Sequence, residues 1–262
     1  MSIKHIIKYC LLAVLIPLHA VARALGIARQ GVAVLMYHGV GDEPWEVSVS
    51  SQTLKRQLDM LRRSGFQFIS LAVFERILRG ELAMPRRSVL ITFDDAYQSV
   101  ADNAVTELRA RNIRPVLYVH TSRAQEPLGN TYTLMSWQAI REGAKFMDVG
   151  SHSHAHPVLK ELSDAELGDD IQKSIAVCHE EVGITPTTFA YPGGKFSERV
   201  IAALRRHGFT TAFTINQGLV RRGDNPFQLR RIGITSHTTN LELYAHAVGV
   251  GEWYGQIMKL FK

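Results

Sequence analysis

The feature that most constrains the fold is the recurrence, from Gly31 onward, of short apolar runs separated by segments with helical spacing. The runs Val32–Tyr37, Val89–Phe93 and Val116–His120 have the length of strands and are almost entirely apolar, which indicates burial on both faces. Such strands form parallel sheets covered by helices. About seven or eight strand–helix units predict an α/β fold, a distorted (β/α)7-8 barrel rather than an open doubly wound sheet.

Residues 1–30 differ from this pattern. Two lysines precede an apolar run from Tyr9 to Leu18, which is shorter than the roughly 20 residues that a membrane-spanning helix needs. Small residues up to Ala22 resemble a signal cleavage site. Three interpretations stay open here, namely a cleaved export signal, an uncleaved helix lying on or anchored in the membrane, and a buried helix of the fold. We therefore divide the chain into a signal or membrane-associated segment, 1–30, and one domain, 31–262, that carries the chemistry.

The charge distribution argues against nucleic acid as a partner. The net charge is +6, but +4 of it comes from the first 31 residues, where Lys4, Lys8, Arg23 and Arg29 occur without any acid. The other basic residues are scattered, as on a solvated surface. A basic arm beside an apolar run indicates an anionic membrane surface as partner. We expect a protein of the cell envelope, either membrane-associated or exported. With only two cysteines, the chain has neither a disulfide framework nor a cysteine-based zinc site.

Polar residues follow the apolar runs where the predicted strands end. His38 follows the first run, Asp94 and Asp95 follow the run at 89–93, and His152 and Tyr191 follow two later ones. In a barrel of parallel strands, catalytic residues gather at this end. We therefore expect these side chains to surround one site.

Two adjacent carboxylates and a histidine cluster predict a metal in that site. Asp94 and Asp95 place two like charges in one cleft, which is costly unless a cation is present. His152 and His156 are four residues apart, so their rings can converge in a helix or a tight loop. With Asp95 they form a set of three ligands that leaves positions open for water and substrate. The ligand types favour one Zn²⁺, with Co²⁺, Ni²⁺ or Mn²⁺ as alternatives, and Asp94 is left to accept a proton from the attacking water.

Five motifs, taken together, resemble the polysaccharide deacetylase family, also called the NodB-homology or carbohydrate esterase 4 group. The resemblance runs in order through residues 31–240, and the pairing of TFDD with HSxxHP makes it specific. It implies a distorted (β/α) barrel that removes an acetyl group from an N-acetylated sugar. The motifs are VLMYHGV at residues 34–40, LITFDDAY at 90–97, VGSHSHAHPVL at 149–159, TFAYPGGKF at 188–196 and QLRRIGI at 228–234.

The resemblance also implies a role for each matching residue. Asp94 matches the catalytic base. The family's metal ligands match Asp95, His152 and His156. His38 resembles the histidine that serves as general acid and protonates the leaving amine, and His237 is its rival for that role.

Three further residues complete the predicted site. The backbone N–H of Gly193 matches the donor that binds the tetrahedral oxyanion, and Tyr191 is a candidate to stack on a sugar ring. Arg231 resembles an arginine of a late strand that holds the catalytic aspartate ionised. The chain departs from its relatives at two positions, with Ala190 where many carry arginine and Ala96 where glycine is usual.

The motifs do not specify what carries the acetyl group. The basic, apolar N-terminus suits a lipid-linked sugar intermediate of lipopolysaccharide or polysaccharide biosynthesis, and an exported polymer or peptidoglycan is the alternative. We predict a metal-dependent N-deacetylase, a hydrolase of non-peptide amide bonds, acting on an N-acetylated amino sugar. Two other classes stay open. One is a non-catalytic glycan-binding barrel, and the other is a phosphoesterase, which normally needs more His and Asp ligands and a second metal.

Overall fold

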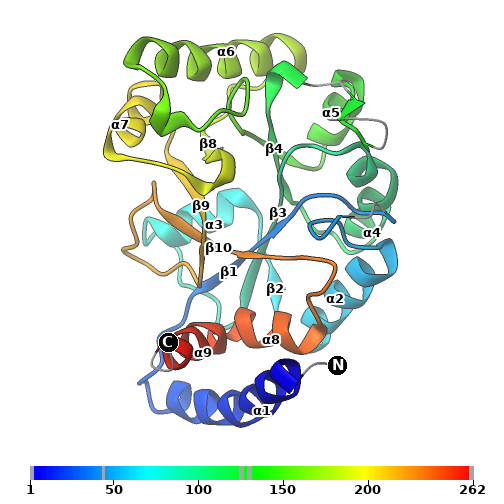
Figure 1. Ribbon diagram of the computed structural model, residues 1–262, viewed down its shortest axis with the longest axis vertical. Coiled ribbons are helices and arrows are strands. Elements are labelled where there is room, and N and C mark those ends of the chain that lie inside the picture. Colours follow the sequence, from blue (N-terminus) through cyan, green and yellow to red (C-terminus); the bar gives the residue numbers. More distant parts are fainter. Residues whose placement is uncertain (1–2, 43–44, 124–126, 129–131, 260–262) are drawn as a thin grey trace.

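The structure, a computed structural model, describes residues 3–42, 45–123, 127–128 and 132–259. A parallel barrel closes because β1 (Val32–Tyr37) pairs with both β3 (Ser88–Phe93) and β10 (Leu229–Gly233) (Figure 1). The prediction of a distorted (β/α) barrel is confirmed. The ring is completed by β4 (Val116–Val119), β7 (Asp148–Ser151), β8 (Thr188–Ala190) and β9 (Thr211–Gln217).

The short strand β2 (Gln67–Phe68) distorts the barrel. It pairs with Ser88 and Val89 at the start of β3, whereas β4 pairs with Thr92 and Phe93 at its end. Since β1 pairs along the whole of β3, β2 and β4 must share its other edge. The barrel therefore has seven closed strands and an eighth that joins only one end.

Helices cover the outside of the barrel, and six of them begin at a serine or threonine whose hydroxyl accepts a hydrogen bond from the first turn. The longest also has a capping box, in which Ser163 and Glu166 bond each other's backbone N–H. A π-helical turn, 100–104, precedes α4, and a two-stranded hairpin is formed by β5 (Pro127–Leu128) and β6 (Tyr132–Thr133). The helices are α2 (Ser51–Arg63), α3 (Leu71–Leu78), α4 (Val105–Ala110), α5 (Trp137–Ala144), α6 (Asp164–Val182), α7 (Glu198–Arg206), α8 (Asn240–Val248) and α9 (Val250–Lys259).

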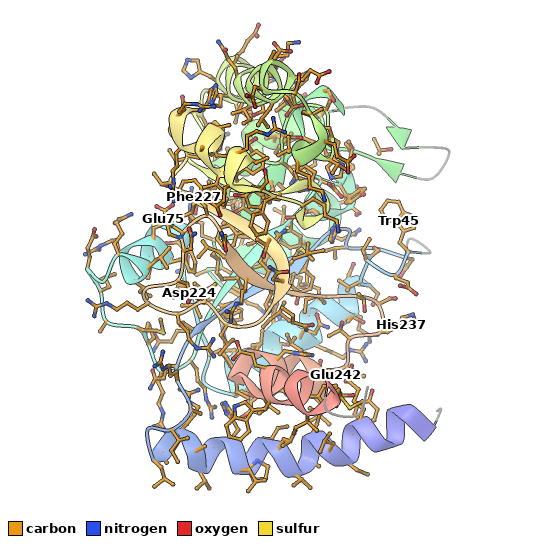
Figure 2. The ribbon with its side chains drawn as sticks, turned by 60° about the vertical axis from the view of Figure 1, so that its left-hand side comes forward. Trp45, Glu75, Asp224, Phe227, His237 and Glu242 are labelled. Carbon is orange, nitrogen blue, oxygen red and sulfur yellow. The ribbon has the colours of Figure 1, made fainter. Side chains whose placement is uncertain are left out.

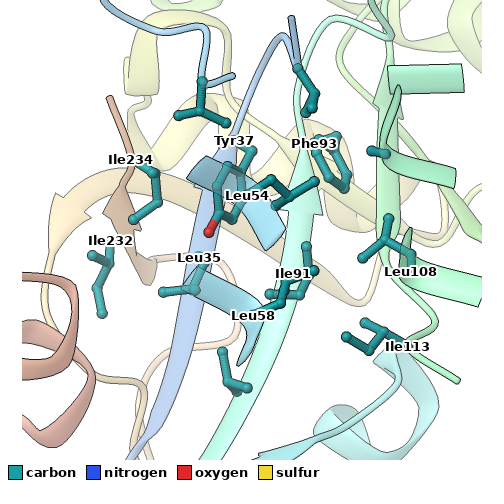
Figure 3. Packing of buried hydrophobic residues seen from close by; sticks show 14 of the residues in the cluster. Leu35, Tyr37, Leu54, Leu58, Ile91, Phe93, Leu108, Ile113, Ile232 and Ile234 are labelled. Atoms are coloured by element: carbon teal, nitrogen blue, oxygen red, sulfur yellow. The ribbon is translucent and has the colours of Figure 1, made fainter. Parts of the chain in front are cut away.

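Side chains of β1 alternate between two apolar layers. Leu35 and Tyr37 face outward and pack with Leu54 and Leu58 of α2, as Figure 3 shows. Val34 belongs instead to the cluster that fills the barrel interior. The alternation explains why the strands are apolar on both faces, as the sequence indicates.

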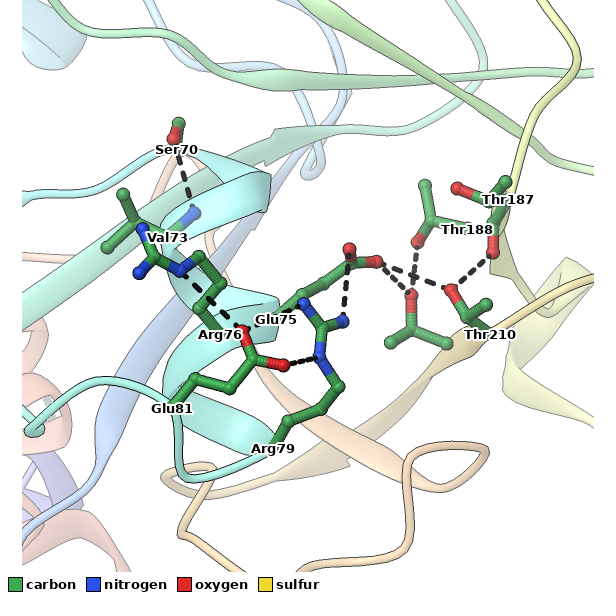
Figure 4. A network of polar contacts seen from close by, with 10 residues as sticks. Ser70, Val73, Glu75, Arg76, Arg79, Glu81, Thr187, Thr188 and Thr210 are labelled. Carbon is green, nitrogen blue, oxygen red and sulfur yellow. Dashed lines mark hydrogen bonds and ion pairs between the residues drawn. The ribbon is translucent and has the colours of Figure 1, made fainter.

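The end of the barrel opposite the predicted site is sealed by α3. Phe74 packs against Phe213 of β9, with ring centroids 5.6 Å apart. Beside it, the hydroxyls of Thr210 and Thr211 donate to Glu75 at 3.4 and 3.3 Å (Figure 4). Burial raises the pKa of Glu75. This end is therefore filled, and the predicted site lies at the other end, where the strands have their carboxyl termini.

The N-terminal helix α1 (Ile3–Ala24) lies outside the barrel against α8 and α9 (Figure 1). Leu12 and Leu15 are buried there, and Lys8 forms an ion pair with Glu242 of α8. Among the residues described, no helix is both long and apolar enough to cross a membrane.

Candidate active site

The three predicted metal ligands converge from two loops at the carboxyl ends of the strands. Asp95 lies just after β3, and His152 and His156 lie in the loop after β7. Nε2 of His152 is 3.5 Å and Nε2 of His156 is 3.7 Å from Oδ1 of Asp95. One ligand atom from each residue lies within 4.8 Å of the others, and this is the one such set in the described part of the chain.

The spacing of these atoms fits a single zinc-sized ion. Two ligands about 2.1 Å from a tetrahedral zinc lie about 3.4 Å apart, close to the two distances to Asp95. The set is also open, since the side chains of Asp95 and His156 are 15% and 35% exposed. Three ligands with an open side are typical of a catalytic rather than a structural metal.

Backbone strain is concentrated in these two loops. Asp95, Ala96, Ser153 and His156 all have a positive φ, between 55° and 70°, and they are four of the five non-glycine residues of this kind in the described structure. Left-handed backbone is costly for residues with a side chain and is retained mainly where function requires it. Here it turns the ligands toward one another. Ala96, at φ 55°, stands where a glycine would be less strained.

Hydrogen bonds orient the ligands from behind. Nδ1 of His152 lies 2.7 Å from the backbone oxygen of Ala190, so it carries the proton and leaves the Nε2 lone pair directed at the metal position. The hydroxyl of Tyr97 donates to Oδ2 of Asp95 at 3.1 Å, which leaves Oδ1 for the metal. Partners of this kind fix the orientation of a ligand and tune its affinity.

We expect Tyr97→Phe to lower metal affinity by about 10- to 100-fold, because Asp95 then loses the bond that orients it. Affinity is measured by competition with a chelating dye. Tyr191→Phe is the matched control, since its hydroxyl donates to the backbone oxygen of Phe227 instead. Equal affinity in the Tyr97→Phe protein and the wild type would show that the hydroxyl does not position the ligand.

Asp170 of α6 supports the histidine loop. Its Oδ1 and Oδ2 accept the backbone N–H groups of His154 and Ala155 at 3.0 and 2.9 Å, and the residue is buried. Both carboxylate oxygens are therefore used to hold the chain between the two histidine ligands. A buried N–H without an acceptor costs about 1–3 kcal/mol.

Asp170→Asn is accordingly expected to destabilise the protein by about 1–3 kcal/mol and to weaken metal binding, because an amide NH₂ would face one of the two N–H groups. The neighbouring Asp169 offers a matched control, since it is exposed and its ion pair is with Lys173 on the helix surface. Asp169→Asn should change stability by less than about 0.5 kcal/mol. Chemical denaturation and dye competition measure the two effects, and identical curves for both variants would contradict the assignment.

Asp94 lies beside the ligand set but forms its closest bonds elsewhere. It is 2% exposed, and Nη1 and Nη2 of Arg231 donate to its two carboxylate oxygens at 2.7 Å each. Nε of the same arginine donates to the backbone oxygen of Thr214 at 2.9 Å. Burial alone would raise the pKa of Asp94, but Arg231 outweighs it and lowers the pKa to about 2. Asp94 is thus a buried, ionised carboxylate next to the metal position.

The rival histidines occupy different surroundings. His38 is close enough to Asp94 to contribute to its lowered pKa, and its Nδ1 is buried without a hydrogen-bond partner in the described structure. His237 is exposed, in a shallow cavity with Thr53 and Arg56, and Figure 2 shows it at the edge of the molecule. His154 bonds the Thr121 hydroxyl at 2.9 Å and is not one of the three ligands.

Gly193 and Tyr191 differ in their access to the site. Gly193 is exposed, with φ 57°, in the turn that follows β8, and a Cβ there would meet nothing within 4 Å. Tyr191 is fully buried, its ring stacks on Phe196 at 5.2 Å and its hydroxyl bonds the backbone of Phe227. The expectation that Tyr191 stacks on a sugar is therefore wrong, because the side chain at this strand end turns into the core.

Two residues of the site, Tyr97 and Asp170, are absent from the sequence-based prediction. Tyr97 lies two positions after Asp95, inside the motif at residues 90–97, and this position is the sequence signal that places it near the site. Asp170 shares a buried helix face with Leu167 and Ile171. An acid at an apolar position of a helical pattern signals a buried partner, although the sequence does not say which one.

Several known proteins are similar to this chain in sequence or in fold. The sequence pattern of the polysaccharide deacetylase family matches residues 81–212, about half of the chain. The poly-beta-1,6-N-acetyl-D-glucosamine N-deacetylase of Staphylococcus epidermidis is 25% identical over 199 residues, which cover 72% of this chain and 68% of that protein. The enzyme of the same name from Escherichia coli strain K12 is 24% identical over 233 residues, covering 73% of this chain but 35% of that protein.

A solved structure shows the same fold. The structure of IcaB from Ammonifex degensii has a TM-score of 0.78 and 27% sequence identity, and the match covers 84% of this chain and 98% of that one. The similarity in fold thus extends over nearly the whole of that protein.

Proposed function

We propose that this chain, which belongs to the polysaccharide deacetylase family and is a carbohydrate N-deacetylase, uses one divalent metal ion in its reaction. The reaction hydrolyses the acetamido group of an amino sugar in an envelope glycan. Acetate and a free amine are the products. The observation that carries the proposal is the pairing of an open three-ligand set with Asp94, an ionised carboxylate that is not itself a ligand.

Asp95, His152 and His156 would hold the metal. A divalent ion bound there supplies a Lewis acid that polarises the acetyl carbonyl and lowers the pKa of water. Zinc suits the ligands best, with cobalt, nickel and manganese as alternatives. One such set in the described residues favours this chemistry over that of a two-metal phosphoesterase.

The remaining residues move protons and bind charge. Asp94, kept ionised by Arg231, accepts the proton of the attacking water. His38 gives a proton to the leaving nitrogen, and its proximity to Asp94 favours it over the exposed His237. The backbone N–H of Gly193 binds the oxyanion that forms at the acetyl carbon.

The names of the relatives support an N-acetylglucosamine polymer as the substrate class. A lipid-linked amino sugar is the second candidate, and the observation that favours it is the N-terminal helix, whose outward face is apolar. Both substrates place the enzyme in the cell envelope, at the membrane or exported.

Acetate release from a panel of substrates tests the proposal. The panel contains soluble β-1,6-linked N-acetylglucosamine oligomers, β-1,4-linked oligomers and polyprenyl-phosphate-linked N-acetylhexosamine, each with and without a chelator. We expect release that the chelator abolishes and that added metal restores. The preferred substrate separates polymer from lipid-linked sugar. Absence of release from every substrate by metal-loaded protein would contradict the proposal and favour a glycan-binding barrel.

A further inference from the structure

The outward face of α1 is apolar from Ala13 to Ala24, and it continues to Leu25 just beyond the end of the helix. Val14, Leu18, Val21 and Leu25 recur at helical spacing and are 55–68% exposed. With Ile27, they make up five of the nine large hydrophobic side chains that are exposed in the described structure. Residues that lie between them on this face, such as Ala13, Ala20 and Ala24, are small and uncharged. Exposed apolar side chains gathered in this way mark an interaction surface.

The opposite face of α1 is docked on the domain. Leu12, Leu15 and Ala22 are buried, and the ring of His19 packs edge-on against Trp253 of α9 at 4.9 Å. Lys8 pairs with Glu242, which Figure 2 shows on α8 just above the helix. The helix is thus held in place by one side, while its apolar outer side points away from the barrel.

Basic groups without acidic partners border this outer face. Arg23, Arg86 and Arg87 line a cavity between α1 and the barrel, together with Ala20 and other residues of the helix flank. Nη2 of Arg23 donates to the backbone oxygen of Arg86 at 2.8 Å, and no carboxylate pairs with any of the three in the described structure. Burial and the charges of Arg86 and Arg87 lower the pKa of Arg23. Three uncompensated cations at one place favour an anion as neighbour.

We propose that α1 lies in the headgroup region of an anionic phospholipid bilayer, with its outer face among the acyl chains and lipid phosphates bound by Arg23, Arg86 and Arg87. An apolar face flanked by arginines is what an interfacial helix requires. The occupant of the face is the bilayer rather than a second copy of the chain, because a copy would bring its own arginines to the same rim and add like charge.

The proposal rests on the proposed function and deepens it, because it says where the deacetylase works. Figure 2 shows α1 along the base of the molecule, with Trp45 and His237 on the side toward which its N-terminal end points. His237 follows the carboxyl end of β10 and so marks the end of the barrel that carries the site. With α1 lying in the membrane surface, that end of the barrel faces parallel to the membrane rather than away from it. A glycan attached to the bilayer or emerging from it would reach the metal ligands from the side.

Vesicle co-sedimentation of the full chain tests the proposal without any turnover. Vesicles of phosphatidylcholine are compared with vesicles that also contain phosphatidylglycerol. We expect binding to both types of vesicle, stronger to the anionic ones, and we expect salt to weaken this additional binding. Leu18→Glu should lower binding to both types by about tenfold or more, and Arg86→Glu should lower binding to the anionic type alone by about tenfold.

Two matched controls lie on α7, away from α1. Ala202→Glu and Arg206→Glu make the same charge changes at exposed positions and should bind as the wild type does. Each variant is also assayed for deacetylation of a soluble oligomer. This assay verifies that the variant is folded, and it tests the proposed function independently of vesicle binding. Equal binding by Leu18→Glu and wild type would overturn the proposal. So would a dimer in sedimentation velocity that Leu18→Glu abolishes, without vesicle binding.

Discussion

Asp94→Asn is expected to lower kcat for deacetylation by about 100- to 10,000-fold while the protein still binds its metal. The amide keeps the size and position of the side chain but cannot accept the proton of the attacking water. The ligand set is untouched, because Asp95, His152 and His156 do not include it. The measurement is acetate release at saturating substrate, with metal content determined on the same sample.

The neighbouring Asp95 gives the contrasting variant. Asp95→Asn should lose metal affinity first and activity as a consequence, so excess metal should restore part of its rate but none of that of Asp94→Asn. Folding is verified for both by circular dichroism, because Asp94→Asn leaves Arg231 buried without a counter-charge. A rate within about tenfold of the wild type would exclude Asp94 as the base.

The sequence predicts the barrel well because most of its strands carry their own signal. A run such as Val89–Phe93 is apolar on both faces, and that pattern follows from local burial on the two sides of a barrel wall. The pairing of β2 and β4 along one edge of β3 has no such local signal. It depends on contacts between segments far apart in the chain, which periodicity does not encode.

The site is predictable where chemistry restricts residue type and spacing. Metal ligands must be specific residues, so Asp95 and the two histidines stand out, and the structure brings them together. Supporting residues face weaker restrictions. Asp170 holds a loop that lies 14 to 18 residues earlier in the chain, a contact visible only after folding. Tyr191, by contrast, is predicted to be in the site but lies in the core. A tyrosine at a strand end can point either into the cleft or into the core, and the sequence does not distinguish the two.

The second large effect is expected from Arg231→Leu, which should lower the free energy of unfolding at neutral pH by about 3–5 kcal/mol. The substitution leaves the carboxylate of Asp94 buried and removes the two donors that hold it at 2.7 Å. An uncompensated buried charge is among the costliest single changes in a protein interior. Arg230 is the matched control, because it is 45% exposed on the other face of β10 and its nearest acid is 3.7 Å away. Arg230→Leu should cost less than about 1 kcal/mol.

The pH dependence of that loss identifies its cause. In the wild type the pKa of Asp94 is about 2, below its ordinary value, so its stabilising contribution is complete above about pH 4 and is lost as the pH falls toward 2. In Arg231→Leu, burial becomes the main influence and raises the pKa of Asp94. As the pH falls, Asp94 is therefore protonated, and the variant no longer carries an uncompensated buried charge. The stability difference between the two proteins should therefore be largest at neutral pH and shrink in acid. Urea denaturation of chelator-treated protein across this range measures it, and a difference that does not change with pH would mean that the arginine acts by packing rather than by charge.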